Sequence, residues 1–447
     1  MARPQRLSGF PEWLPEGQVV QQFIEDAARR VFELHGFGGI ETRAVEPLEQ
    51  MLRKGEIDKE VYVLRRLHAD ERDADAGLGL HFDLTVPFAR YVLEHAGHLE
   101  FPFKRYQIQK VWRGERPQEG RFREFTQADI DVVGRDVLPF QYEVEMAVTM
   151  AALLAELPIP PAVIQVSNRK LAEGFYRGVG ATNPASVLRA VDKLDKIGIE
   201  ATKRLLEEDA GLTQEAADAC LSLAAIRTPD SSFVDRVRSL GVSDPLLDEG
   251  LIELAAVVDG ANLLRPGSVV ADLRIARGLD YYTGTVYETE LVGYESVGSI
   301  ASGGRYDSLA SDGKQTYPGV GISLGVTRLV SVLLGRDLVR VTRPVPTVVL
   351  VAVLDDDSRP SSEQVAATLR SRGISCEVAP SADKFGKQIK YADRRGIPFV
   401  WFPDGGGHSV KDIRSGAQAP ADAEDWRPPE EDLVPRVLTT TSQEAQP

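Results

Sequence analysis

The sequence predicts an α+β protein: an antiparallel sheet flanked by helices, interrupted by a helical insertion and followed by a smaller α/β domain. Three observations indicate this fold. Strand-like patterns fill residues 79–134 and return at 269–310, whereas 165–262 is mostly helical. After a linker at 336–346, strands alternate with helices, which is typical of a small parallel sheet with right-handed crossovers.

Length and composition limit the class of protein. The chain has 447 residues, enough for about three domains at roughly 150 residues each. Its net charge of −15 argues against a protein held on nucleic acid mainly by bulk electrostatics. The two cysteines, Cys220 and Cys376, are far apart, which excludes a disulfide scaffold and a cysteine-rich zinc site. No apolar run reaches the roughly 20 residues that span a bilayer, and the N-terminus lacks the apolar core of a signal peptide. We therefore expect a cytoplasmic protein without a membrane partner.

The first part of the main domain is expected at 1–164. Apolar residues recur at helical spacing over 19–34, and Gly36 stops this helix. Strands and turns are expected over 79–134. A second helix, 141–156, ends at the prolines that follow it.

The second part of the main domain follows the helical insertion, which we place at 165–262. It is expected at 263–338, where three strand-like segments precede a strand that runs into a helix. These segments are VVADLRIA, TGTVYETEL, SIASGGRYD and PGVGISLGVTRLVSVLLG.

The C-terminal α/β domain is expected at 345–436. Three strands, PTVVLVAVL, ISCEVAP and IPFVWF, alternate with two helices, SSEQVAATLRSRG and DKFGKQIKYADRRG. The remaining residues, 437–447, are expected to be a disordered tail.

Residues 104–134 concentrate polar groups that could carry chemistry. Two strand-like halves flank the turn-rich GERPQEG, so a hairpin would bring Arg113 near the face that carries Gln127 and Asp131. A cation, an amide and a carboxylate then meet on one sheet surface. The alternative is a solvent-exposed polar face of an antiparallel sheet, but the density of charged groups exceeds what such a face needs.

This segment resembles motif 2 of the class II aminoacyl-tRNA synthetases, and in particular that of the histidyl-tRNA synthetase family. HFDLTVPFARY, 81–91, resembles its amino-acid-binding turn, and PGVGISLGVTRL, 318–329, resembles class II motif 3. RGLDYYTGTVYE, 277–288, and SGGRYD, 302–307, resemble its two histidine-specific motifs, which form a highly specific pair. Together with the N-terminal helix and the C-terminal region, the resemblance covers nearly the whole chain. It implies a class II synthetase catalytic domain and a C-terminal anticodon-binding domain.

The resemblance also implies a histidine–tRNA ligase that works in two steps. L-histidine and ATP give histidyl-adenylate and pyrophosphate, and the terminal ribose hydroxyl of tRNA(His) then attacks the activated carbonyl. Because the nucleophile belongs to the substrate, the protein has to supply orientation and charge neutralisation, for which arginine forks are suited. The implied cofactors are ATP and Mg²⁺, with the protein ligands of the metal left open. A homodimer with the N-terminal region at its interface is implied as well.

The resemblance assigns Arg113 and Arg277 to catalysis, on opposite sides of the α-phosphate. Arg113 would also bind the amino-acid carboxylate. The residues implied for ATP binding are Arg113, Glu115, Arg121, Phe125 and Arg328. Those implied for histidine binding are Asp83, Leu84, Thr85, Arg113, Gln127, Asp131, Arg277, Tyr281 and Tyr282. For Arg328 the alternative is an ordinary arginine on a helix surface.

The α-ammonium group of an amino acid needs hydrogen-bond acceptors, which Asp83, Thr85 and Gln127 would supply. For Asp83 and Thr85 the alternative is a helix cap. His81 stands where the family usually has arginine, so the local support of Asp83 is expected to differ.

A neutral imidazole offers one donor and one acceptor nitrogen. Asp131 could accept from one nitrogen, and the hydroxyl of Tyr282 or Tyr281 could donate to the other. One of the two tyrosines is expected to pack in the core, because adjacent strand residues face opposite ways. Such a pocket rejects apolar amino acids, which would leave its polar groups unsatisfied.

Two regions are expected to contact tRNA. From Lys384 to Arg414 the chain has seven basic residues and three acidic ones, a net charge of +4. On the helix in this segment, the side chains that could contact tRNA phosphates are Lys384, Lys387 and Lys390. The alternative there is a solvated helix face. In the turn at 114–120, Arg116 and Gln118 are expected to read the acceptor end.

The main alternative is a non-catalytic paralogue of the same family with a regulatory or RNA-binding role. Such relatives typically lose the catalytic arginines or the imidazole pocket. Here Arg113, Arg277, Asp131 and Tyr282 are all present.

Overall fold

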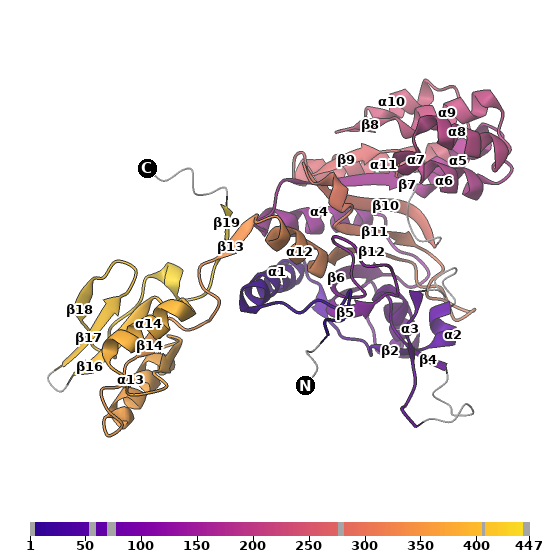
Figure 1. The fold of residues 1–447 in the computed structure, drawn as a ribbon. Coiled ribbons are helices and arrows are strands. Elements are labelled where there is room, and N and C mark those ends of the chain that lie inside the picture. Colours follow the sequence, from indigo (N-terminus) through magenta and orange to yellow (C-terminus); the bar gives the residue numbers. More distant parts are fainter. Residues whose placement is uncertain (1–4, 53–59, 69–76, 276–280, 405–406, 441–447) are drawn as a thin grey trace. The chain divides into compact units, whose positions relative to one another are not determined.

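The computed structural model describes residues 5–52, 60–68, 77–275, 281–404 and 407–440 (Figure 1). The chain divides into two compact units, which are described one at a time. The first comprises Met1–Pro11 and Ile24–Val332, and the second Glu12–Phe23 and Leu333–Pro447. Within the described residues, no helix is long and apolar enough to cross a membrane.

The first unit is built on a nine-stranded sheet with the order β1-β5-β6-β12-β11-β10-β7-β9-β8. Its strands are β1 (Gly38–Gly39), β5 (Phe103–Trp112), β6 (Glu124–Val133), β7 (Ala162–Asn168), β8 (Arg227–Thr228), β9 (Val269–Asp272), β10 (Tyr282–Leu291), β11 (Ala301–Tyr306) and β12 (Gly319–Gly325). All neighbours are antiparallel except the pairs β1–β5 and β7–β9. The predicted antiparallel sheet is therefore confirmed.

Strands β5 and β6 form the predicted hairpin. Arg105 pairs with Asp131 and Gln109 with Gln127, and the Arg113 amide donates to the carbonyl of Arg123 at 2.9 Å. The alternative of an exposed polar face is wrong for the inner part of β6, because Asp131 is only 3% exposed. Both faces of β6 are covered there, so its carboxylates need partners inside the protein.

Helices cover the sheet. α1 (Pro15–Leu34) begins four residues before the predicted start, and α4 (Gln141–Glu156) has the predicted bounds. α4 packs on β6, β7 and β12, and α12 (Val326–Gly335) follows directly from β12 (Figure 1).

The prediction of only strands and turns over 79–134 is wrong at α3 (Thr85–His95). Pro87 is compatible with this helix because it lies in the first turn, where the missing amide would have no intrahelical partner. Beside α3 lie α2 (Leu48–Leu52) and a three-stranded sheet, β2-β4-β3. These short strands are β2 (Val45–Pro47), β3 (Val63–Leu64) and β4 (Leu78–Leu80).

The segment predicted as a helical insertion, 165–262, is mostly helical in the structure. Its helices are α5 (Arg169–Gly178), α6 (Pro184–Val191), α7 (Leu194–Ile197), α8 (Ile199–Glu208), α9 (Gln214–Ala224), α10 (Phe233–Arg238) and α11 (Pro245–Leu264). Side-chain oxygens of Asn168, Asn183, Thr213 and Asp244 cap four of them, as the cap preferences of these residue types predict. Residues 165–168 belong to β7, and β8 also joins the main sheet.

The second unit contains a five-stranded sheet with the order β15-β14-β16-β17-β18. Its elements are β14 (Val349–Val351), α13 (Arg359–Ser371), β15 (Cys376–Val378), α14 (Phe385–Arg395), β16 (Phe399–Asp404), β17 (Gly407–Asp412) and β18 (Gln418–Pro420). β14, β15 and β16 are parallel, as predicted. β17 and β18, which are not among the strands predicted from the sequence, add an antiparallel edge to this sheet.

Both faces of this second sheet are buried. Val349 and Val351 pack in one core cluster with Leu369 of α13, whereas Leu350 packs in the other with Ala392 of α14. When successive residues of a strand pack in the cores on opposite faces of the sheet, all of them are apolar. This explains the continuous apolar sequence at 346–354.

A two-stranded sheet corrects two sequence predictions. β13 (Val339–Val341) lies within the predicted linker and pairs with β19 (Val437–Thr439). β19 lies within the range 437–447 that the sequence predicts as a disordered tail, so these three residues are strand instead. Residues 441–447 lie outside the described part of the chain.

Candidate active site

A cleft in the first unit brings together six residues that the sequence predicts for one site. They are Arg113, Glu115, Arg121, Phe125, Gln127 and Arg328. Its walls come from β6, β11, β12 and the start of α12, with the turn after β5 at its edge.

Arg113 is held by backbone and by an aromatic ring. Its Nε donates to the carbonyl oxygen of Phe82 at 2.9 Å, and its guanidinium lies 5.1 Å from the centroid of the Phe125 ring. The side chain remains 31% exposed. A guanidinium fixed at the edge of a cleft and still accessible can bind an anion without first being ordered.

Cations outnumber anions in the lining of this cleft. Glu115 lies 3.8 Å from Arg113 and 3.6 Å from Arg121, so one carboxylate serves two guanidinium groups. Arg328 is a third cation. Among the described residues that line the cleft, three arginines therefore face one carboxylate, which favours an anionic ligand.

Arg328 is not an ordinary helix-surface arginine, so that alternative is wrong. Its Nε donates to the carbonyl of Gly120 at 2.7 Å, and a second nitrogen donates to the carbonyl of Ser299. Burial lowers the pKa of Arg328, and the neighbouring cations Arg121 and Arg113 lower it further. A guanidinium whose charged form is disfavoured in this way gains from binding an anion.

A second group of predicted residues lies on β6, β10 and the segment before α3. Asp131 forms a buried ion pair with Arg105, with 2.6 Å between Oδ2 and the guanidinium, and its Oδ1 accepts from the hydroxyl of Tyr306 at 2.8 Å. Neither Arg105 nor Tyr306 is among the site residues predicted from the sequence. Arg105 could have been found, because the hairpin register places it opposite Asp131.

The two tyrosines lie together. Their ring centroids are 4.7 Å apart. The ring of Tyr281 also packs against that of Tyr306, with 6.1 Å between the two centroids. The expectation that they face opposite ways is wrong, because Tyr281 precedes β10 and strand alternation begins only at Tyr282. Burial raises the pKa of both hydroxyls, so they remain protonated and able to donate.

Asp83, Leu84 and Thr85 lie at the start of α3. Asp83 Oδ1 accepts from the amide of Val86 at 3.1 Å, so the helix-cap alternative is correct for this carboxylate. The carbonyl of Leu84 accepts from Arg105 at 3.4 Å. An ionised carboxylate can accept several hydrogen bonds, so a role as a helix cap does not exclude a role in ligand binding.

His81 is completely buried beside this helix start. Its Nε2 lies 2.7 Å from the carbonyl oxygen of Lys110, and its ring stacks on Trp112 with centroids 5.6 Å apart. Burial lowers the pKa of His81, which favours the neutral ring. His81 is therefore a packed core residue that holds the segment before Asp83 against β5.

Two further polar side chains of β6 lie between these groups. Gln127 donates from Nε2 to Ser323 Oγ at 2.7 Å, while its Oε1 has no hydrogen-bond partner among the described residues. Burial raises the pKa of Asp129 to about 7, against the opposing effect of Arg105. Asp129 is not among the site residues predicted from the sequence, although it shares the face of Gln127 and Asp131.

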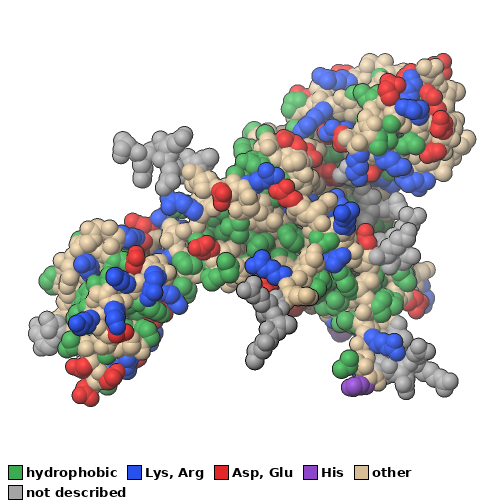
Figure 2. Space-filling model, viewed as in Figure 1, with side chains coloured by type: hydrophobic (Ala, Val, Ile, Leu, Met, Phe, Trp, Pro, Cys, Tyr) green, Lys and Arg blue, Asp and Glu red, His purple; other side chains and the backbone are tan. Residues whose placement is uncertain are grey.

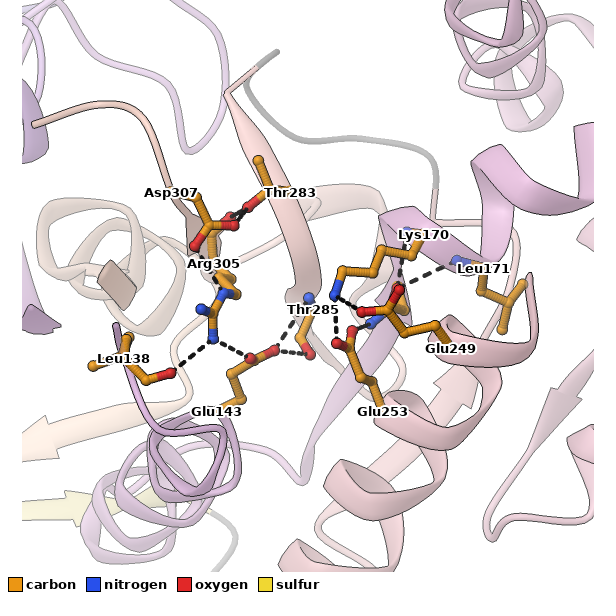
Figure 3. Close-up of polar contacts among 11 residues, drawn as sticks. Leu138, Glu143, Lys170, Leu171, Glu249, Glu253, Thr283, Thr285, Arg305 and Asp307 are labelled. Carbon is orange, nitrogen blue, oxygen red and sulfur yellow. Dashed lines mark hydrogen bonds and ion pairs between the residues drawn. The ribbon is translucent and has the colours of Figure 1, made fainter. Parts of the chain in front are cut away.

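Arg305 and Tyr306 are adjacent in β11, so their side chains lie on opposite faces of the sheet. Figure 3 shows the polar contacts of Arg305. It forms ion pairs with Asp307 at 3.1 Å and with the buried Glu143 of α4 at 2.9 Å, and Glu143 also accepts from the Thr285 amide at 3.3 Å. Arg305 therefore joins β10, β11 and α4 behind the tyrosines. A Cβ at Gly303 would lie 2.0 Å from a backbone oxygen of β12, so that glycine is required by internal packing.

The other predicted residues are placed as follows. Arg277 lies outside the described residues. Arg116 and Gln118 are exposed in the turn after β5, which two backbone hydrogen bonds between Gln118 and Arg121 close. The lysines of α14 are exposed as well, and Lys387 pairs with Asp383 at 3.0 Å. Figure 2 shows Lys and Arg side chains gathered on the visible face of the second unit, to which α14 belongs. The described part of the chain contains no cluster of three or more His, Cys, Asp or Glu residues that could hold a metal ion.

Comparison with known families matches both units. A family model described as "Histidyl-tRNA synthetase" matches residues 9–329, and one described as "Anticodon binding domain" matches residues 347–403.

Individual relatives match over their full length. The chain is 60% identical to the histidine–tRNA ligase of Cutibacterium acnes, covering 98% of this chain and 100% of that protein. It is 61% identical to that of Micrococcus luteus, covering 98% and 99%. The crystal structure of histidyl-tRNA synthetase from Nostoc sp. PCC 7120 matches with a TM-score of 0.83 and 36% identity over 95% of this chain and 98% of that one.

Proposed function

The chain belongs to the histidyl-tRNA synthetase family and is a histidine–tRNA ligase, and from this premise we propose which of its residues carry each step. The main cleft binds ATP, and the polar groups of β6, β10 and the α3 start bind L-histidine. The alternative of a non-catalytic paralogue is set aside, since the closely related full-length proteins are ligases.

The observation that carries the ATP assignment is the excess of guanidinium groups in the cleft. Arg113, Arg121 and Arg328 line it together with a single carboxylate, Glu115. In this proposal Arg113 contacts the α-phosphate and the histidine carboxylate, Arg121 lies along the pyrophosphate, and Arg328 contacts the γ-phosphate. Phe125, which already lies against Arg113, provides the surface for the adenine ring.

The first step forms histidyl-adenylate. A carboxylate oxygen of histidine attacks the α-phosphorus, the new O–P bond forms, and the bond to the bridging oxygen breaks as pyrophosphate leaves with its electron pair. Arg113 and Arg277 orient the two reactants and neutralise charge on the phosphorus oxygens. Mg²⁺ bound to the nucleotide would neutralise the pyrophosphate further. Such an ion needs only one or two protein carboxylates, and Glu115 is suitably placed in the cleft to contribute one.

Histidine is held through its ammonium group and its ring. Asp83, Thr85 and the carbonyl oxygen of Gln127 accept from the ammonium, and Leu84 lies between the first two in the chain. Asp131 accepts from one ring nitrogen, and Tyr281 or Tyr282 donates to the other. The Gln127 Oε1, which is buried and lacks a partner among the described residues, supports this assignment.

The second step transfers the histidyl group to tRNA(His). We assign the exposed Arg116 and Gln118 to the acceptor end, and α14 to backbone phosphates of the tRNA through Lys384, Lys387 and Lys390.

The catalytic parts are 1–164 and 263–338, the insertion 165–262, and the anticodon-binding domain 345–436. The protein acts in the cytoplasm as a homodimer with the N-terminal region at the interface.

Histidine-dependent ATP–pyrophosphate exchange tests this proposal. The wild type is expected to exchange with histidine alone among the amino acids. Arg113→Ala and Arg277→Ala are each expected to lower the exchange rate by about 100-fold or more, because each removes a group that stabilises transition-state charge. The matched control is Arg238→Ala, which replaces an exposed arginine of α10 and should keep the wild-type rate. A wild type that exchanges with no amino acid, or full activity in both site variants, would overturn the assignment.

A further inference from the structure

The carboxylate proposed to contact the imidazole is already paired inside the protein. Asp131 and Arg105 are 3% and 0% exposed, and 2.6 Å separates Oδ2 from the guanidinium. Arg105 in turn lies 4.3 Å from the centroid of the Phe88 ring, which removes it from solvent. The pair therefore has no net charge and sits in a region of low dielectric constant, where an added charge interacts strongly.

The guanidinium of this pair is only partly hydrogen-bonded. Arg105 Nε and one of its terminal nitrogens have no hydrogen-bond partner among the described residues. A second cation placed against Asp131 would share this carboxylate with Arg105, and the two cations would repel one another in a region of low dielectric constant. An uncharged N–H donor can use the same carboxylate without that repulsion.

The other groups around Asp131 are two neutral phenols and two further carboxylates, Asp129 and Asp83, and the carboxylates act against the charge of Arg105. Tyr306 of β11 donates to Oδ1 at 2.8 Å, and Tyr282 of β10 lies nearby, and burial raises the pKa of both, so they are neutral phenols. Asp129 of β6 has a pKa raised to about 7 by burial, so it is partly protonated at neutral pH. Asp83, before α3, is the acceptor assigned to the α-ammonium group.

We propose that Arg105 makes the pocket select the neutral imidazole of histidine over the imidazolium, acting as a positioning residue through Asp131. This inference rests on the proposed histidine site. Its consequence is that histidine loses a ring proton when it binds at a pH below the pKa of its ring.

Calorimetric titration of the full chain with L-histidine at pH 5.5, in two buffers of different ionisation enthalpy, measures the protons released on binding. The control ligand is 2-fluoro-L-histidine, whose fluorine keeps the ring uncharged throughout this range, so proton exchange by Asp129 and other protein groups cancels in the comparison. Since the imidazole of histidine is mostly protonated at pH 5.5, histidine should release most of one proton more than the analogue. A difference near zero means that imidazolium binds, and overturns the proposal.

Variants test the part played by Arg105. In the wild type, histidine should bind several-fold more weakly at pH 5.5 than at pH 7.5, in proportion to the fraction of histidine whose ring is neutral. Arg105→Lys keeps the cation and should keep this ratio. Arg105→Met leaves a proton to be shared between Asp131 and the ring, so the ratio should shrink or reverse. A folded Arg105→Met protein with the wild-type ratio would overturn the role of Arg105.

The wild-type comparison decides the main point even where the methionine variant does not fold. Failure of the wild type to bind histidine at all would remove the histidine site itself, and with it this inference. Normal binding without the extra proton release would remove the inference alone.

Discussion

At the scale of single residues, the proposed site depends on contacts that the protein makes with the side chains proposed to bind ligands. Asp131 is held by Arg105 and Tyr306, and Arg113 by the carbonyl of Phe82. A small residue opposite Asp131 is equally necessary. A Cβ at Gly321 would lie 2.2 Å from Asp131 Oδ1, closer than nonbonded atoms approach.

Gly321→Ala tests this arrangement. The added methyl group must displace the Asp131 carboxylate, so the KM for histidine in the exchange assay should rise by about tenfold or more, since small displacements of positioning groups are costly. The KM for ATP should change much less, because the cleft proposed to bind ATP is lined by other residues. Gly335→Ala is the matched control, since a Cβ there meets nothing within 4 Å. Equal KM values for histidine in the wild type and Gly321→Ala would contradict the prediction.

At the scale of elements, strands buried on both faces carry the polar groups of the site and the core of the second unit. In β6, Asp129 and Asp131 lie on one face, and Ala128 and Ile130 on the other, and all four are buried. In the second unit, β13 has a simpler environment. It pairs along its length with β19, and Val339 and Val437 are 6% and 8% exposed.

Removal of residues 437–447 should therefore destabilise the second unit. The truncation deletes β19, exposes Val339 and leaves the hydrogen-bonding groups of β13 without this strand, so we expect a loss of about 2 kcal/mol in the free energy of unfolding, in line with the burial of one or two valine side chains. Denaturant titration of both proteins measures this loss. A chain that ends at Thr440 keeps β19 and is the control. Equal unfolding midpoints for the two truncated chains would show that β19 contributes nothing.

At the scale of the whole molecule, charge is unevenly distributed along the chain. The protein carries a net charge of −15, whereas Lys384–Arg414 carries +4. An acidic protein that binds a polyanion has to do so through local basic surfaces, because its mean field repels the ligand.

Replacement of Lys384, Lys387 and Lys390 by alanine should separate the two steps of the reaction. The KM for tRNA in aminoacylation should rise, while histidine-dependent exchange, which needs no tRNA, stays at the wild-type rate. If all three lysines contact phosphates, the salt dependence of tRNA binding should weaken by about one unit of slope for each lysine. The triple arginine variant retains the charges and serves as the control. An unchanged salt dependence in the alanine variant would show that α14 does not contact the phosphates.

The sequence alone predicted the features that depend on neighbouring residues or on family motifs. The alternation at 124–133 predicted the hairpin and its polar face, and helical spacing predicted α4 to the residue. The family, the activity and the mixed α and β architecture followed from the motifs. Local patterns failed where longer contacts decide the outcome: α3 was missed, and so were β13 and β19, whose pairing joins segments about a hundred residues apart in the chain.

The tertiary structure alone decided which charges compensate one another. Asp131 meets Tyr306 across 175 positions of the chain, and Arg305 meets Glu143 across 162. No spacing rule predicts such contacts, because they arise when strands and helices from separate segments pack in one core. Burial then determines the protonation of each group, and that is a property of the folded chain rather than of any segment of its sequence.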